Sequence, residues 1–234
     1  MFSLLRSKII PILWLVFVPF LVHGQWNLAN HDLKKFYFGI TLSYNQAEFH
    51  LNHSAYFLQQ DTVLVAEPLI TSGFGLGLIG TMRLNKRFSL RINPSLIFAE
   101  KNIRYVLNQD SSQTQANQNI ESVLTSLPIQ IKFESDRIKN FKVYAIGGLK
   151  MDYDLSENSR AKKGNQLILI HALDFGYEGG VGFQFYFPSF IFSPEIKISN
   201  GLGNLLVGNK GYIYSHVLDK LTSRMIIFSI HLEG

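Results

Sequence analysis

The chain has 234 residues, of which 47% are hydrophobic and 17% charged, and these proportions indicate one domain with a substantial apolar surface. The formal net charge of +5 falls to +3 without residues 1–24, which contain two basic and no acidic residues, and this is too mild for a nucleic-acid-binding protein. There is no cysteine, so disulfides do not contribute to stability, which must come from packing and hydrogen bonding.

Residues 1–24 have the form of a secretory signal peptide. Two basic residues precede an apolar run over residues 9–22, and Val22 and Gly24 occupy the −3 and −1 positions of a cleavage site. The apolar run is only 14 residues long, whereas a helix that spans a membrane needs about 20. We therefore predict a cleaved signal peptide and a mature domain over residues 25–234.

In the mature chain, hydrophobic and polar residues alternate with a period of two. The first such segment covers residues 36–44, where Phe36 and Phe38 share one face and Tyr37 and Thr41 share the other. Similar segments follow at residues 73–84, 88–98, 122–133, 141–151, 173–187, 190–198 and 226–232. Segments of roughly 9 to 13 residues suit tilted strands that cross a bilayer. The pattern predicts an all-β fold, an eight-stranded antiparallel outer-membrane β-barrel.

The connections between these segments alternate in length. Long polar connections are expected near residues 50–71, 100–120, 154–172 and 200–221, and short turns at 85–87, 135–140 and 188–189. In outer-membrane barrels the long loops are extracellular and the short turns periplasmic, which places both termini in the periplasm. Residues 109–119, rich in Gln, Asn and Ser, are predicted to form a mobile surface loop.

Aromatic residues fall into two predicted belts. One lies near the short turns and the other near the long loops, as in the interfacial girdles of membrane barrels. The belts comprise Phe36, Phe88, Phe133, Phe141, Phe185, Phe187 and Phe190, and Tyr44, Phe74, Phe98, Tyr153 and Phe175. A soluble barrel such as a lipocalin would instead place its apolar face inward.

The interior of an eight-stranded barrel is just wide enough for side chains to fill, so no solute pore is expected. The inward-facing charged residues are Arg83, Arg91, Lys132, Lys142, Lys150, Asp174, Glu178, Glu195 and Lys197. Unpaired charges away from water are costly, so we expect a paired structural network in which Arg91 and Lys132 pair with Glu178 and Glu195. The alternative is a basic channel or docking site. Inward glycines are expected to make room for Tyr37, Tyr144 and Tyr186.

Three patterns resemble reactive or binding sites, but their context or spacing does not support such a site. A G-x-G-x-x-G match over residues 75–80 lies inside a predicted strand and opens no helix. His50 and His53, in a predicted loop, would need further ligands to hold a metal. Ser229, His231 and Glu233 share one strand face, but successive same-face residues are about 6.6 Å apart, too far for direct hydrogen bonds. We predict no catalytic, cofactor-binding or metal-binding residues, and no cofactor.

Several ordered segments resemble the PorT family of Bacteroidetes. They are residues 31–39, 90–96, 127–132, 144–148, 173–182, 194–197, 201–203 and 222–225. The resemblance spans nearly the whole mature chain and implies an outer-membrane barrel associated with type IX secretion and gliding motility.

The leading hypothesis is therefore a non-enzymatic barrel that supports protein export by assembling or stabilising the type IX machinery. The alternative is a general small surface barrel that acts as an adhesin, a ligand binder or a membrane stabiliser, and a lipid-hydrolysing enzyme is the third. Expected partners are outer-membrane lipid or lipopolysaccharide and other type IX components, with no nucleic acid and no small-molecule substrate.

Overall fold

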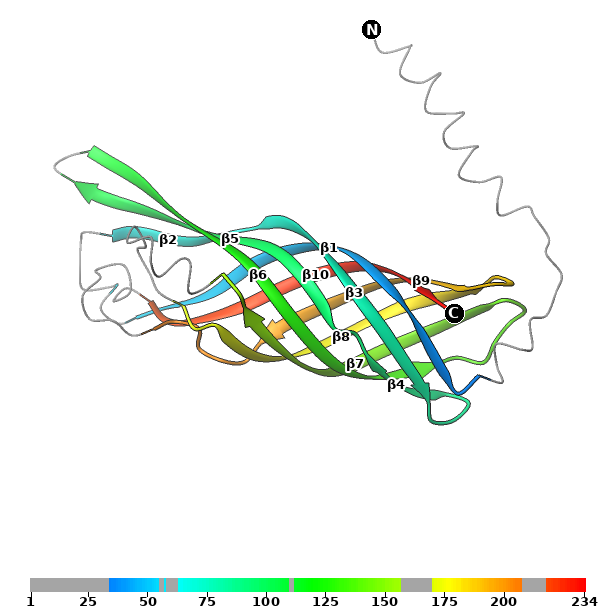
Figure 1. Cartoon of the computed structure of the whole chain (residues 1–234). Helices are drawn as coiled ribbons and strands as arrows, with labels where there is room; N and C mark the ends of the chain where they lie inside the picture. The colour runs from blue at the N-terminus through cyan, green and yellow to red at the C-terminus, as the bar shows by residue number, and fades with distance from the viewer. Residues whose placement is uncertain (1–33, 55–56, 58–62, 110–111, 157–169, 208–217) are drawn as a thin grey trace, which may run out of the picture.

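The computed structural model describes residues 34–54, 57, 63–109, 112–156, 170–207 and 218–234, so the predicted signal peptide lies outside the described residues. The described chain forms ten strand segments: β1 (Phe36–His53), β2 (Val63–Leu69), β3 (Thr71–Arg83), β4 (Phe88–Ile92), β5 (Ser95–Gln109), β6 (Ser112–Glu134), β7 (Phe141–Asp154), β8 (Leu173–Tyr186), β9 (Ile191–Gly201) and β10 (Leu218–Glu233). Figure 1 shows them wound into an elongated barrel of tilted strands. No helix among these residues is long and apolar enough to span a membrane.

The ten segments occupy eight positions around a closed ring. β2 and β3 continue each other around Ile70, and β4 and β5 continue each other around Asn93 and Pro94. The ring closes because β1 pairs antiparallel with β10 on one side and with β3 on the other. Pro94 has no N–H to donate, which explains why the predicted strand over 88–98 is split there. The predicted eight-stranded antiparallel barrel is confirmed.

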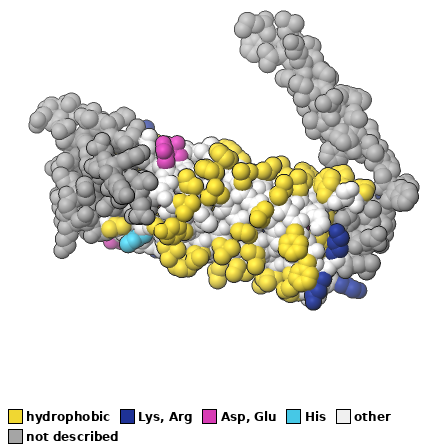
Figure 2. All heavy atoms as spheres, in the orientation of Figure 1, with side chains coloured by type: hydrophobic (Ala, Val, Ile, Leu, Met, Phe, Trp, Pro, Cys, Tyr) yellow, Lys and Arg dark blue, Asp and Glu magenta, His cyan; other side chains and the backbone are white. Residues whose placement is uncertain are grey.

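The outer wall is apolar, as the alternation predicts. On β1 the side chain of Phe38 is 68% exposed while its neighbour Tyr37 is 4% exposed. Figure 2 shows hydrophobic side chains covering the middle of the barrel. An exposed apolar surface of this extent, here called the apolar belt, is typical of a wall that faces lipid.

Aromatic rings contact one another at both edges of the apolar belt. Near the short turns the ring centroids of Phe88 and Phe133 lie 5.1 Å apart, and those of Phe187 and Phe190 lie 4.9 Å apart. At the opposite edge, Phe74 stacks on Phe98 with a centroid distance of 4.8 Å. The short turns lie where they were predicted, between β3 and β4, β6 and β7, and β8 and β9.

Two of the predicted long loops are wrong. Residues 100–120 form most of a hairpin in which β5 and β6 pair as far as Gln109 and Ser112, and part of 50–71 forms β2, which pairs with β5. The composition of residues 109–119 hid this, because paired backbone groups rather than apolar side chains hold that part of the hairpin together. Figure 1 shows the hairpin extending well beyond the rest of the barrel.

Candidate functional site

The lumen of the barrel is packed with charged side chains. Of the nine residues predicted to line it, eight are buried: Arg91, Lys132, Lys142, Lys150, Asp174, Glu178, Glu195 and Lys197. The ninth, Arg83, is half-buried at the short-turn end, with its guanidinium 5.3 Å from the centre of the Tyr37 ring. These residues come from six strand segments, and period-two alternation turns them all toward the interior.

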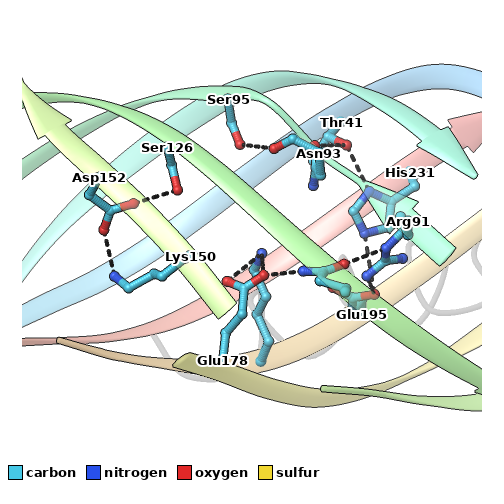
Figure 3. A network of polar contacts seen from close by, with 12 residues as sticks. Thr41, Arg91, Asn93, Ser95, Ser126, Lys150, Asp152, Glu178, Glu195 and His231 are labelled. Atoms are coloured by element: carbon cyan, nitrogen blue, oxygen red, sulfur yellow. Dashed lines mark hydrogen bonds and ion pairs between the residues drawn. The ribbon is translucent and has the colours of Figure 1, made fainter. Parts of the chain in front are cut away.

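One ion pair crosses the whole lumen. Arg91 on β4 and Glu195 on β9 lie on opposite walls, because three ring positions separate them in either direction. The Nη2 atom of Arg91 lies 2.6 Å from Oε2 of Glu195, and neither side chain is exposed to solvent. The same carboxylate oxygen accepts a hydrogen bond of 2.9 Å from the Tyr144 hydroxyl, and Arg91 Nε donates to Gln130 Oε1 at 2.5 Å. Figure 3 shows Arg91 and Glu195 pointing toward each other inside the barrel.

Other lumen charges pair along one strand or between neighbouring strands. Lys197 lies 3.1 Å from Glu178, which also accepts a hydrogen bond from the Gln130 amide. Lys132 and Lys142 both reach Glu134, each at 3.3 Å. Of the pairs expected from the sequence, the structure brings together Arg91 with Glu195 but joins Lys132 to Glu134 instead of Glu178, because Lys197 occupies Glu178.

The nine predicted residues leave out five further charged residues that are buried in the described chain: Lys101, Glu134, Asp152, Asp154 and Glu233. Two of these are acids that pair with predicted lysines. Glu134 and Asp152 are buried and inward-facing, and Lys150 Nζ lies 2.5 Å from Asp152 Oδ2. Both acids continue the inward parity of their strands but lie one position past the predicted ends at 133 and 151. Extending β6 and β7 by one residue would have found them.

The residues Ser229, His231 and Glu233 are not joined into a reactive unit. His231 instead places Nδ1 at 2.8 Å from Thr41 Oγ1 and Nε2 at 3.5 Å from Glu195 Oε2. Hydroxyl, imidazole and carboxylate are the groups of an acyl-transfer triad. However, Thr41 is only 3% exposed, and the carboxylate is already engaged by a guanidinium. This arrangement holds the walls together and gives a substrate no access.

The remaining sequence patterns do not form binding sites either. His50 and His53 lie in β1 rather than in a loop, both are exposed, and the strand register shifts between Asn52 and His53. His53 Nε2 is 3.0 Å from the Ala66 carbonyl oxygen. Among the described residues there is no group of three potential ligands placed to hold a metal. Residues 75–80 lie within β3, as predicted.

Beyond the apolar belt, at the end away from the short turns, the polarity of the wall reverses. On β1 the inward residues Ala47 and Phe49 are 0% and 1% exposed, while the outward Glu48 lies 3.9 Å from Arg224 of β10. Two apolar clusters fill the interior there, and together we call them the outer core: Phe49, Ala66, Ile103, Tyr105, Ile120, Ile170, Leu205, Leu218 and Leu221, and Ala47, Ile97, Ala99, Leu124, Met225 and Ile227. An apolar interior inside a polar wall is the arrangement that water requires. This end of the barrel is therefore built to stand in water.

Comparison with known proteins agrees with this architecture. A family model described as an outer membrane protein beta-barrel domain matches residues 25–207. The outer membrane protein OprG from Pseudomonas aeruginosa is 12% identical, with a TM-score of 0.45 over 85% of this chain and 93% of that one. Neisserial surface protein A is 12% identical, with a TM-score of 0.44 over 85% and 96%. Ail, the attachment invasion locus protein of Yersinia pestis, is 10% identical, with a TM-score of 0.38 over 86% and 100%. No curated protein matches the chain.

Proposed function

Because the chain belongs to the outer membrane protein beta-barrel domain family and therefore lies in the outer membrane, we propose that it is a non-enzymatic surface barrel that binds a partner outside the cell. The short turns then face the periplasm, and the outer core, the β5–β6 hairpin and the connections around them face the exterior. The binding surface is the part of the barrel that projects beyond the apolar belt.

The observation that carries this proposal is the outer core. Tyr105 and Ile103 on β5 are fully buried although they lie well past Phe98, the residue of that strand in the outer aromatic belt. From Phe98 to Gln109, the strand continues for about 37 Å at roughly 3.4 Å per residue. A barrel that served only as a membrane anchor could close with loops at the edge of the belt. A projection with its own dry core provides a rigid support for recognition.

The lumen argues against solute transport. The Arg91–Glu195 pair joins opposite walls, and neither side chain is exposed. A solute would have to break this pair and leave two buried charges without partners, which costs several kcal/mol. The proposed activity therefore belongs to the outer surface and not to the interior.

A second candidate function is support of the type IX secretion machinery, and the ordered resemblance to the PorT family favours it. Residues 127–132 and 173–182, two of the matching segments, lie on β6 and β8 within the apolar belt. Such a role would use the lipid-facing wall or the periplasmic end, rather than the projection.

A complementation experiment separates the two functions. A strain without the gene receives either the native protein or a variant in which residues 107–114 are replaced by Asn-Gly, which retains the pairing of Val106 with Gln115. A variant in the β8–β9 turn at the opposite end, Ser189→Ala, serves as the control. Adhesion, stress resistance and the secreted proteome are measured in each strain.

We expect the hairpin variant to lose adhesion or stress resistance, with secretion unchanged and the control variant normal. Loss of many secreted proteins in the deletion strain, restored by the hairpin variant, would favour the secretion role and contradict surface binding. A deletion strain that is unaffected in all three measurements would contradict both.

A further inference from the structure

The short-turn end of the barrel contains a cavity of about 580 Å³ with a basic lining. It is lined by Lys34, Lys35, Arg83, Leu84, Asn85, Lys86, Ser135, Asp136, Arg137 and Lys142. Six of these ten side chains are basic and one is acidic, so the lining has a formal charge of +5. Figure 2 shows Lys and Arg side chains gathered at this end of the described barrel. We call this cavity the basic mouth.

Two guanidinium groups of the basic mouth are held in place before any ligand arrives. The guanidinium of Arg137 makes two hydrogen bonds within its own turn, of 2.6 and 2.7 Å, and lies 4.3 Å from the centre of the Tyr186 ring. Arg83 lies over the ring of Tyr37. Both tyrosines are 4% exposed and contact the same small apolar cluster. Positioned guanidiniums lose little conformational entropy when they bind an anion.

The acids near the basic mouth already have partners, and only Lys142 of these partners belongs to its lining. Asp136 pairs with Arg87 at 2.9 Å, and Arg87 does not belong to the lining. Glu134, below the cavity, is shared between Lys132 and Lys142. The positive charge of the lining therefore exceeds what these acids neutralise.

The lining also indicates which kind of anion fits. Leu84 is its one apolar residue, so the cavity offers no surface for lipid acyl chains. Its volume lies within the range of about 300–1,000 Å³ found for ligand clefts, far above the size of a single phosphate. The cations come from three separate elements: the chain before β1, the β3–β4 turn and the β6–β7 turn with the start of β7. A ligand with several spaced negative charges matches this distribution.

We propose that the basic mouth binds an extended acidic peptide segment, with its Asp or Glu carboxylates on the guanidinium and ammonium groups. Arg83 and Arg137 would hold carboxylates through two parallel hydrogen bonds each, which is the strongest arrangement for such pairs. In the orientation proposed above, the partner is a periplasmic protein. This site lies at the end opposite the proposed outer binding surface and does not depend on it.

The test uses the mature chain folded in nanodiscs of zwitterionic lipid and a fluorescein-labelled hexaglutamate peptide. Labelled hexaglutamine is the neutral control, and inorganic phosphate is a competitor. Two double variants remove charge from the basic mouth, Arg83→Gln with Arg137→Gln and Lys34→Gln with Lys35→Gln. A third, Lys220→Gln with Arg224→Gln, removes the same charge from the opposite end.

We expect hexaglutamate to bind with an affinity that falls as salt rises, and to bind at least about tenfold more weakly to each mouth variant. The control variant should stay within about twofold of the native chain. Because Lys34 and Lys35 are exposed and precede β1, their replacement leaves the barrel folded, which migration on unheated gels verifies. Equal binding of hexaglutamine, or equal weakening by the control variant, would overturn the proposal. If inorganic phosphate, added at the same total negative charge, displaces hexaglutamate, the basic mouth binds a small anion and the acidic-peptide proposal is wrong.

Discussion

Breaking the ion pair that spans the lumen should strongly destabilise the barrel. The loss of stability should differ between removal of Arg91 and removal of Glu195. We consider Arg91→Met, Glu195→Met and the double variant. Methionine fills a similar volume without charge, so each single change leaves the other charge buried. Figure 3 shows that the partners that remain differ in the two cases.

Without Arg91, the Glu195 carboxylate keeps the hydrogen bond from Tyr144 and the contact with His231 at 3.5 Å. Without Glu195, the Arg91 guanidinium keeps the hydrogen bond to Gln130, and the Tyr144 hydroxyl loses the carboxylate to which it donates. Removal of one partner from a buried pair costs about 3–5 kcal/mol. We therefore expect a loss near 3 kcal/mol for Arg91→Met and near 5 kcal/mol for Glu195→Met.

The double variant should recover much of this loss, because neither buried charge remains. Its residual cost is about 1–3 kcal/mol from hydrogen-bonding groups left without acceptors or donors. The loss in the double variant should thus fall short of the two single losses together by about 5–7 kcal/mol, which is the coupling energy between Arg91 and Glu195.

Urea titration of the refolded protein in detergent micelles measures these values, with the folded fraction read from migration on unheated gels. A loss below about 1 kcal/mol for both single variants, or strictly additive losses, would refute the reasoning. Either result would mean that water enters the lumen and solvates the charges.

The remaining predictions concern packing and depth in the membrane, and the same titration measures them. A Cβ at Gly182 would lie 2.5 Å from the Tyr144 hydroxyl oxygen, so Gly182→Ala should cost about 1–3 kcal/mol. Gly147 has no atom within 4 Å of an added Cβ, so Gly147→Ala should change stability by less than about 0.5 kcal/mol, and equal effects would contradict the packing argument. Leu78 is 64% exposed in the middle of the belt, so Leu78→Arg should lower the free energy of unfolding by about 2–4 kcal/mol. Ile70 is 66% exposed and lies between β2 and β3, so Ile70→Arg should lower the free energy of unfolding by only about 0–1 kcal/mol. A larger loss would mean that the apolar belt extends past Ile70 toward the outer end.

The strands within the apolar belt could be predicted because lipid outside and polar packing inside impose opposite demands on successive residues. Phe36, Phe38 and Ile40 lie outward and Tyr37 and Thr41 inward, as the alternation requires. The inward parity also located the lumen charges without any structural knowledge. Pair partners could not be derived in the same way, because they depend on register and on distances across the ring. Lys132, for example, finds Glu134 two positions along its own strand.

The outer core escaped prediction for a physical reason. Within the belt, apolar residues face outward and polar residues face inward. Beyond the belt this pattern is inverted, because the outside is water and the interior must be apolar. The segment from Ile103 to Tyr105 still alternates, but with its apolar residues inward. If apolar residues are assumed to face outward, this segment looks like a polar loop. If they are assumed to face inward, the same alternation predicts the outer part of β5.

The level at which the outward-facing residues change from apolar to charged marks the outer edge of the lipid-facing wall. On β10 the outward residue Phe228 lies in the belt, and the outward Arg224, four residues nearer the outer end, is paired with Glu48 of β1. On the far side of the ring, Glu100 of β5 lies opposite Glu121 of β6, again just beyond the belt. A charge on the outer wall is costly at mid-membrane and tolerated near the interface. The outward parity of Arg224 is therefore explained by depth. The outward charges of these four strands, β1, β5, β6 and β10, define one boundary, and on the same strands the inward residues just beyond it include Phe49, Ile103, Ile120 and Leu221 of the outer core.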